Sequence, residues 1–369
     1  MELQNIVENF KLNGKVKNIE AYGNGHINTT FLIECDYNGG TLRYILQKIN
    51  TNVFPNVEGL MNNIQSVTTF LRNKIVENNG DPDRETLNLV PTIDGKSYYT
   101  CKDGSYRVYK FIEDTVALQI AESNEVFEGA GFAFGNFVKM LNDFDASGLF
   151  EVIKNFHNTA DRFKKFINAV DKDAVKRAES VREEIDFVLK RSSICDNIIS
   201  LIESKTIPLR VTHNDTKLNN VLIGSENGKP ICVIDLDTIM PGSLLYDFGD
   251  AIRSGCNTGL EDEPDLSKVG FDISLFESFT KGFMAGVGNC ITAVERDLLS
   301  LGAIMMTFEC GMRFLTDYLE GDVYFKIHYP EHNLVRCHTQ FKMVADMESM
   351  RDKMDEIVRK YSKVWKAIL

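Results

Sequence analysis

The chain has 369 residues, 43% of them hydrophobic and 25% charged, a composition that is ordinary for a globular protein and sufficient for two modest cores. The formal net charge of −12 argues against a nucleic acid or an anionic membrane as partner, because both would be repelled on average. The eight cysteines include no C-x-x-C pair, which favours reduced thiols in a reducing compartment. Neither a signal-like N-terminus nor a long apolar run is present, so we expect a cytoplasmic protein.

The first hundred or so residues are expected to form a small sheet that carries one long helix. β-rich segments lie at residues 19–21, 30–35 and 42–49. Apolar residues then recur every three or four positions over residues 56–78, which predicts a helix. Two Asp-Gly turns, at residues 94–95 and 103–104, favour antiparallel hairpins before a last strand that ends near residue 112.

The remainder of the chain is mainly helical in pattern. Residues 121–204 are charged, helical in period and poor in proline, and helical spacing returns from residue 275 to 369, interrupted near 321–330. Between these regions, short apolar β segments at 209–211 and 231–236 enclose a polar loop. We therefore expect two lobes, residues 1–115 and residues 116–369, with the boundary near residues 112–120.

The residues best suited to chemistry lie between the two helical regions. His213, Asp215 and Asn220 make an H-x-D-x-x-x-x-N loop, hereafter the catalytic loop, and Asp235 follows at the end of an apolar strand. Phosphoryl transfer needs a carboxylate to take the proton of the acceptor hydroxyl, and oxygen ligands to hold Mg²⁺ on the phosphates. Asp215 fits the first role, and Asn220 and Asp235 fit the second. The alternative, polar residues that only turn the chain, is weakened by the strand-borne Asp235.

Further charged residues follow within the same segment. Asp237 could touch the metal or the acceptor, or pair with a neighbouring group, and the sequence leaves this open. Asp247 is expected to hold the catalytic loop through backbone hydrogen bonds. Asp250 and Arg253 have the i, i+3 spacing of an ion pair on a helix surface.

A glycine-containing turn lies between the first two expected strands. Gly23 and Gly25 would let backbone N–H groups approach a phosphate, and Asn28 or Thr29 could add side-chain donors. A plain hairpin turn is the alternative.

Lys48 ends the third expected strand, where the lysine of a kinase N-lobe anchors the α- and β-phosphates. The alternative is that Gln47 occupies the inward-facing position and Lys48 points to solvent.

One segment near the C-terminus imitates a zinc site. His328 and His332 fit the pattern H-x-x-E-H, with Cys337 and His338 close by. That pattern binds zinc only when one helix carries both histidines on one face. Pro330, between them, removes a backbone donor and clashes with the preceding turn, which argues against a zinc peptidase.

The preceding segment, residues 309–324, is rich in polar groups suited to a sugar. Arg313 and Tyr324 could hydrogen-bond to a sugar ring or stack on it. A helix with a solvated charged face is the alternative.

Several strings of residues are familiar. THNDTKLNNVL, VIDLDTIMPG and YDFGDAIR resemble the aminoglycoside phosphotransferase/choline kinase superfamily. GNGHINTTF, NFHNT and GMRFLTDYLEGDVYFKIHY resemble more closely the N-acetylhexosamine 1-kinases of that superfamily. The resemblance implies an α+β, eukaryotic-kinase-like two-lobed fold, with an N-terminal antiparallel sheet, one long helix and a larger, mainly helical C-terminal lobe.

The resemblance also implies ATP as phosphoryl donor and Mg²⁺ as cofactor, with residues 1–115 binding the nucleotide and residues 116–369 holding the catalytic loop, the metal and the acceptor. It further implies roles for individual residues. Adenine would bind near Phe111 and Glu113, Asp215 would be the base, and Asn220 and Asp235 would hold Mg²⁺. The residues implied to contact an N-acetylhexosamine are Arg313, Tyr324 and His26. One departure from the wider kinase pattern is Asn214, which stands where an arginine would precede the base.

The acceptor is expected to be small. Asp235 is followed by Leu236-Asp237 rather than Phe-Gly, and the short stretch to Asp247 leaves little room for a loop that binds a peptide.

Competing hypotheses stay open. Another kinase of this fold could act on choline, an aminoglycoside or methylthioribose, and a cationic substrate would suit Asp317, Glu320 and Asp322. A kinase-fold binding protein without catalysis is the hypothesis from a different class. The sequence does not reveal the oligomeric state.

Overall fold

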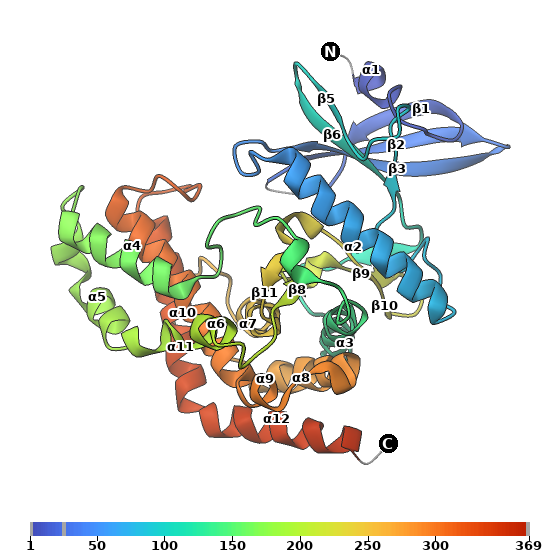
Figure 1. Ribbon diagram of the computed structural model, residues 1–369. Coiled ribbons are helices and arrows are strands. Elements are labelled where there is room, and N and C mark those ends of the chain that lie inside the picture. The colour runs from blue at the N-terminus through green and yellow to red at the C-terminus, as the bar shows by residue number, and fades with distance from the viewer. Residues whose placement is uncertain (1–2, 24–26, 367–369) are drawn as a thin grey trace. The chain divides into compact units, whose positions relative to one another are not determined.

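The computed structural model describes residues 3–23 and 27–366 (Figure 1). They form two compact units, each built from several stretches of the chain. The first unit holds residues 1–116, 143–154 and 222–240, and the second holds residues 117–142, 155–221 and 241–369. The predicted functional division at residue 115 stays a prediction.

The first unit is built on an antiparallel sheet. Its strands are ordered β1-β2-β3-β6-β4, and β5 also pairs with β6. The elements are α1 (Leu3–Val7), β1 (Lys15–Ala21), β2 (Thr29–Tyr37), β3 (Gly40–Ile49), α2 (Val57–Glu77), β4 (Leu89–Val90), β5 (Tyr99–Cys101) and β6 (Gly104–Lys110). A second sheet, ordered β10-β9-β7, uses β7 (Thr115–Ala117), β9 (Val221–Gly224) and β10 (Pro230–Val233).

The two faces of the main sheet have different neighbours. Tyr44 and Leu46 of β3 point into an apolar core that also holds Ile6 and Val7 of α1 and Val108 of β6. Because side chains alternate along a strand, the odd-numbered positions of β3, Gln47 among them, point to the other face. This alternation decides which polar side chains can meet.

The long helix α2 confirms the helix predicted over residues 56–78. The side chain of Asn56 caps its N-terminus by accepting a hydrogen bond of 2.9 Å from the N–H of Gly59. Leu60, Ile64 and Val67 recur on its buried face.

One of the two predicted hairpins is wrong. The turn at residues 103–104 does join a paired hairpin, β5 and β6. The turn at residues 94–95 joins β4 to β5, which do not pair with each other, because both pair with β6. β4 lies opposite Val108 and Tyr109, and β5 lies opposite residues 104–106, so the turn carries the chain along β6 instead of folding it back.

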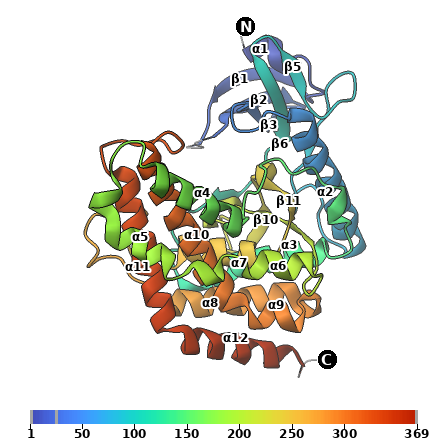
Figure 2. The ribbon, with the colours of Figure 1, turned by 60° about the vertical axis from the view of Figure 1, so that its left-hand side comes forward.

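The second unit is mainly helical. Its helices are α3 (Asn124–Met140), α4 (Thr159–Lys172), α5 (Arg182–Leu189), α6 (Asn197–Glu203), α7 (Leu244–Gly255), α8 (Ile273–Val287), α9 (Ala293–Asp297), α10 (Leu299–Glu320), α11 (His332–Ser349) and α12 (Arg351–Lys366). A two-stranded sheet joins β8 (Arg210–Thr212) to β11 (Met240–Gly242). α10 is largely buried and packs against α4, α7 and α11 (Figure 2). An antiparallel N-terminal sheet with one long helix, followed by a mainly helical region, confirms the predicted fold class.

Helices α3 and α8 touch through their backbones. Glycines 131 and 135 of α3 face glycines 282 and 286 of α8. A Cβ atom at Gly282 would lie 1.8 Å from the carbonyl oxygen of Glu128, and one at Gly131 would lie 2.3 Å from that of Phe279. The close contact between the backbones of α3 and α8 therefore requires glycine at these positions.

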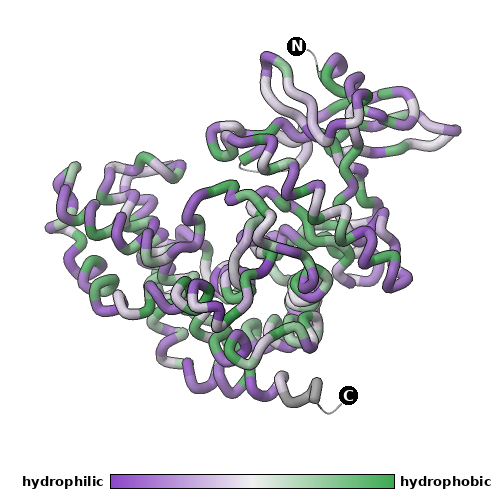
Figure 3. The backbone as a smooth tube through the Cα atoms, in the orientation of Figure 1, coloured by the Kyte–Doolittle hydropathy of each residue, from purple (hydrophilic) through white to green (hydrophobic). Residues whose placement is uncertain are grey.

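The outer helix α12 shows the amphipathic pattern of a surface helix. Met354, Ile357 and Val358 are buried, whereas hydrophilic residues dominate the rest of the helix (Figure 3). Among the described residues, no helix is both long enough and apolar enough to span a bilayer.

Candidate active site

The catalytic loop closes on itself in the second unit. Asp215 follows β8, and Asn220 ends the short helical turn of residues 218–220. The amide nitrogen of Asn220 donates to the backbone oxygen of Asp215 at 2.7 Å and to its carboxylate Oδ2 at 3.2 Å. The structure thus brings together the predicted base and one predicted metal ligand.

Asp247, buried near the start of α7, binds the backbone of the catalytic loop. Its two carboxylate oxygens accept hydrogen bonds from the backbone N–H groups of His213, at 2.9 Å, and Asn214, at 2.7 Å. The predicted role of Asp247 is therefore confirmed. Burial raises the pKa of Asp247 to about 6, although these hydrogen bonds and the nearby His213 oppose the shift.

The backbone just before Asp215 is strained. Asn214 has φ +64°, in the left-handed region, which costs a residue with a side chain roughly 1–2 kcal/mol. Asparagine tolerates this conformation better than most residues. The bonds that hold the loop offset the strain, and the turn directs the side chain of Asp215.

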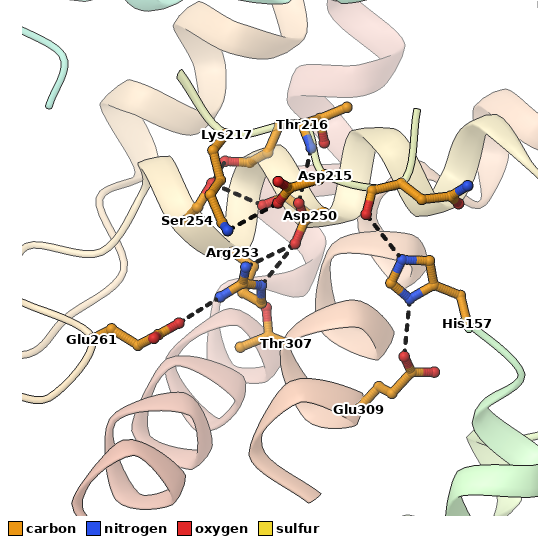
Figure 4. A network of polar contacts seen from close by, with 12 residues as sticks. His157, Asp215, Thr216, Lys217, Asp250, Arg253, Ser254, Glu261, Thr307 and Glu309 are labelled. Carbon is orange, nitrogen blue, oxygen red and sulfur yellow. Dashed lines mark hydrogen bonds and ion pairs between the residues drawn. The ribbon is translucent and has the colours of Figure 1, made fainter. Parts of the chain in front are cut away.

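Lys217 was not singled out from the sequence, although it lies two residues after Asp215. Its Nζ lies 2.9 Å from Oδ1 of Asp215 (Figure 4). Burial lowers the pKa of Lys217, but the carboxylates of Asp215 and Asp250 outweigh that effect and raise it above its usual value. The carboxylate of Asp215 is thus held on one oxygen by Lys217 and on the other by Asn220.

Asp250 and Arg253 form the predicted ion pair, at 2.8 Å, but the pair is buried and not on the helix surface. The prediction of a surface position is wrong because α7 is covered on that side. The second oxygen of Asp250 accepts from the N–H of Thr216 at 3.0 Å, so the pair supports the catalytic loop. Arg253 also contacts Glu261 at 3.0 Å (Figure 4).

The first unit contains Asp235, the second predicted metal ligand. Asp235 is exposed, follows β10 and has φ +59°. Two residues later, Asp237 is buried and engaged on both oxygens: Arg107 lies 2.5 Å from one, and the amide of Asn28 donates to the other at 2.5 Å. Of the roles left open for Asp237, the structure therefore shows the ion pair.

The polar face of the sheet presents Gln47, not Lys48, to this cluster. Gln47 accepts from Arg107 at 2.8 Å and donates to Thr30 at 3.3 Å. Lys48 lies on the other face, with its Nζ 6.0 Å from the ring centroid of Tyr106. The alternation of the strand accounts for the difference, so Lys48 is not on the face that carries Asp237.

The structure describes only part of the glycine-containing turn between β1 and β2. Gly23 has φ +72°, which favours glycine, and Thr29 begins β2. The side chain of Asn28 is bonded to Asp237 and accepts from the N–H of Asn50 at 3.0 Å, so it already has protein partners. Two predicted residues, Gly25 and His26, lie outside the described residues.

Phe111 and Glu113, predicted to lie near adenine, belong to one cluster in the first unit. The guanidinium of Arg43 lies 4.3 Å from the ring centroid of Phe111 and pairs with the carboxylate of Glu113. Tyr22, next to the glycine turn, meets the edge of Phe111 with 5.9 Å between ring centroids. An aromatic surface thus lies beside the glycine turn.

Arg313 and Tyr324, predicted to contact a sugar, lie close together in the second unit. The guanidinium carbon of Arg313 lies 5.9 Å from the ring centroid of Tyr324, and 5.5 Å from those of Phe156 and Phe325. The side chain of Tyr324 remains exposed, at 63%. Burial, together with the positive charge of Arg313, lowers the pKa of nearby Arg162.

A buried carboxylate builds the loop that carries Tyr324. Asp317 accepts from the N–H groups of Val323, Tyr324 and Phe325 at 2.9, 2.7 and 3.0 Å. It also accepts from the amide of Asn333 at 2.7 Å. The sequence showed Asp317 only as an acidic residue and gave no sign of these donors.

Asp322, at the start of the same loop, is also engaged. It lies 2.7 Å from Arg177 and accepts from Asn333 at 2.9 Å.

A model of the phosphotransferase enzyme family, APH, matches residues 18–266, a stretch that contains the glycine turn, the catalytic loop and Asp235. The chain belongs to the phosphotransferase enzyme family. Arg313 and Tyr324 lie beyond the matched stretch.

This phosphotransferase shares its fold with solved structures at low sequence identity. An aminoglycoside phosphotransferase from Alicyclobacillus acidocaldarius has a TM-score of 0.60 and 14% identity, over 98% of this chain and 96% of that one. A microcompartment-associated aminopropanol kinase has a TM-score of 0.56 and 13% identity, over 96% and 98%. Choline kinase from Cryptosporidium parvum has a TM-score of 0.56 and 11% identity, over 92% and 91%.

The zinc-like pattern of this phosphotransferase does not lie on one helix. α11 begins at His332, so His328 precedes it, and Nε2 of His332 lies 3.1 Å from Asp262. Within residues 3–23 and 27–366, no cluster of three or more His, Cys, Asp or Glu side chains could hold a metal. The requirement of that motif is therefore not met.

Proposed function

We propose that this phosphotransferase is an ATP-dependent kinase that phosphorylates the anomeric hydroxyl of N-acetylglucosamine or N-acetylgalactosamine. The observation that carries the proposal is the geometry of Asp215. Lys217 and Asn220 hold its carboxylate, and Asp247 holds the backbone before it. Such a carboxylate can orient a hydroxyl and accept its proton as the γ-phosphoryl group is transferred.

The anomeric hydroxyl suits this base because it is the most acidic hydroxyl of the sugar. Lys217 contacts Oδ1 of Asp215, and the longer bond from Asn220 to Oδ2, at 3.2 Å, leaves Oδ2 able to accept from the acceptor hydroxyl as well. The product would be the N-acetylhexosamine 1-phosphate.

The residues proposed for Mg²⁺ fit a hard cation. Asn220 has committed its amide nitrogen to Asp215, which leaves its oxygen as the atom that can bind a metal. Asp235 is exposed and supplies carboxylate oxygens. Oxygen donors of this kind suit Mg²⁺. When bound, the ion would neutralise charge that develops on the phosphates.

For the nucleotide we propose the first unit. The turn at Gly23 and the ring of Phe111, with Glu113 beside it, would receive phosphates and adenine. Gln47 and Arg107, not Lys48, lie on the face that also carries Asp237.

Charge around the acceptor residues favours a neutral sugar over a cation. Asp317, Asp322 and Glu309 are each bonded to protein partners, so none of them presents an uncompensated carboxylate. Arg162 and Arg313 add positive charge that would repel an ammonium group. A choline- or aminoglycoside-type acceptor, as in some structural neighbours, is therefore the less favoured hypothesis.

The test is ADP release by the purified protein with Mg²⁺-ATP and a panel of acceptors. The panel includes N-acetylglucosamine, N-acetylgalactosamine, glucose, choline, methylthioribose and an aminoglycoside, with Asp215→Asn as control. We expect release only with the N-acetylated sugars, reduced roughly 10²–10⁴-fold in the control.

Other outcomes separate the hypotheses. Release with choline or the aminoglycoside alone would refute the sugar assignment and our charge argument. If no acceptor stimulates release, calorimetry with ATP would show whether the chain is a nucleotide-binding protein without this activity.

A further inference from the structure

His157 is a buried residue to which the sequence analysis assigned no role. It lies just before α4, and its Nδ1 is 3.0 Å from Oε1 of Glu309 on α10 (Figure 4). Its Nε2 is 3.3 Å from the backbone oxygen of Asn214. The imidazole therefore connects α10 to the residue before the proposed base.

The chemistry of the contact with Asn214 fixes the proton on Nε2. A carbonyl oxygen can only accept, so Nε2 must carry hydrogen to bond Asn214. The second oxygen of Glu309 accepts from the hydroxyl of Thr159 at 2.6 Å. Burial raises the pKa of Glu309, but the hydrogen bond and charge of His157 outweigh it and bring the pKa below its usual value. Nε2 thus donates to the carbonyl of Asn214, while Nδ1 shares a hydrogen bond with Oε1 of Glu309.

The contact of His157 with Asn214 matters because this carbonyl belongs to the residue directly before Asp215. Asn214 has left-handed backbone, and its N–H is held by Asp247. Its C=O is held by His157. Both polar backbone groups of Asn214, the residue directly before Asp215, are therefore hydrogen-bonded, and His157 provides the partner of the carbonyl.

Glu309 also links this support to the acceptor residues. It lies on α10 one turn before Arg313, so one buried helix carries both the anchor of His157 and a proposed sugar contact. A shift of α10 would move both together.

We propose that His157 and Glu309 form a positioning pair that sets the direction of Asp215 by holding the carbonyl of Asn214. The catalytic consequence rests on the proposed function, whereas the structural consequence for the loop does not. His157 touches neither acceptor nor nucleotide in this proposal and acts only through the loop.

Two substitutions separate the contacts. His157→Asn keeps a donor near the position of Nδ1 and loses the bond to Asn214, whereas His157→Gln keeps a donor near the position of Nε2. Thr307→Val is the matched control: it removes a buried hydroxyl of α10 that bonds the carbonyl of Ala303 at 2.8 Å.

The first readout is amide hydrogen exchange of peptides that cover residues 210–221, compared with peptides from α3 and α8. We expect at least tenfold faster exchange of the loop in His157→Asn, with little change in α3 and α8. We expect a smaller effect in His157→Gln and none in Thr307→Val. Unchanged loop exchange in His157→Asn would overturn the proposal, whatever the substrate is.

The second readout is steady-state kinetics with the best acceptor. We expect kcat to fall ten- to hundredfold in His157→Asn and less in His157→Gln, with KM for both substrates within threefold. Faster loop exchange with unchanged kcat would also overturn the proposal, because a structural histidine alone would behave in that way. If the wild type phosphorylates no acceptor, the proposed function fails and the exchange data alone decide on the pair.

Discussion

Asp317 offers a sharp test of the proposed acceptor site, because a single carboxylate organises the loop that carries Tyr324. It is 2% exposed and accepts four hydrogen bonds, two on each oxygen. Asp317→Asn keeps the shape but turns one acceptor oxygen into a donor, so two donors lose their partner whichever way the amide lies. At roughly 1.5–3 kcal/mol for each bond to a charged group, the loop loses about 3–6 kcal/mol.

A loop released by that amount would no longer hold Tyr324 beside Arg313. We expect KM for the N-acetylhexosamine to rise at least tenfold in Asp317→Asn, which corresponds to about 1.4 kcal/mol of the loss. KM for ATP should stay within twofold. The assay is ADP release with either substrate varied.

The control is Glu320→Gln, an exposed position on the same helix with the same change of charge. It should leave both KM values within twofold, because the argument rests on hydrogen bonds and not on negative charge. Equal increases in acceptor KM for both variants would refute it, since that result would indicate attraction of a cationic acceptor. An unchanged acceptor KM in Asp317→Asn would remove the loop from the site.

Three further predictions concern stability and are measured by thermal unfolding. Arg107→Met should cost roughly 3–5 kcal/mol, because it leaves Asp237 buried without its ion pair, and adding Asp237→Leu should recover part of the loss; a double variant no better than the single one would contradict this. Gly282→Ala should cost about 1–3 kcal/mol or more by forcing α3 and α8 apart, while Gly148→Ala, which meets open space, should change little. Burial holds the pKa of Asp247 at about 6 in the fold, against about 3.9 in the unfolded chain, so its contribution to stability is largest below pH 4 and is lost as pH rises to 6. Asp247→Asn, which does not titrate, should therefore fall further behind the wild type at pH 5 than at pH 7; a smaller gap at pH 5 would show that the sign is wrong.

The parts of the site that could be predicted are those whose residues lie close in sequence. Asp215 and Asn220 occupy one short loop, and their contact follows from the spacing. Asp247 was also assigned correctly, although 33 residues separate it from Asn214. The helix over residues 56–78 followed from its period.

The remaining features depend on which strands pair and in what register. Gln47 meets Arg107 because β3 pairs with β6 with these two residues opposite each other. A shift of one residue would have placed Lys48 there instead. The sequence fixes neither the partner strand nor the register, so both alternatives had to stay open.

Short elements and contacts between residues far apart in the chain could not be predicted from the sequence either. β9 lies inside the segment interpreted as a polar loop, where four residues are too few to show a period. His157 and Glu309 meet although most of the second unit separates them in sequence. Pattern reasoning finds periodic or adjacent residues, and these are neither.

The left-handed backbone at Asp235 limits which residues can serve there. Aspartate and asparagine tolerate this conformation because their short polar side chains can bond locally, and glycine tolerates it without offering any ligand. Glutamate carries the same charge, but its longer side chain would be strained in this left-handed turn, which presents the proposed metal ligand. A negative charge alone therefore does not make a residue suitable at this position, because the side chain must also tolerate the left-handed backbone. In any variant of this phosphotransferase, the left-handed backbone at position 235 favours aspartate, asparagine or glycine. Of these three, only aspartate and asparagine have a side-chain oxygen that could bind the proposed metal ion.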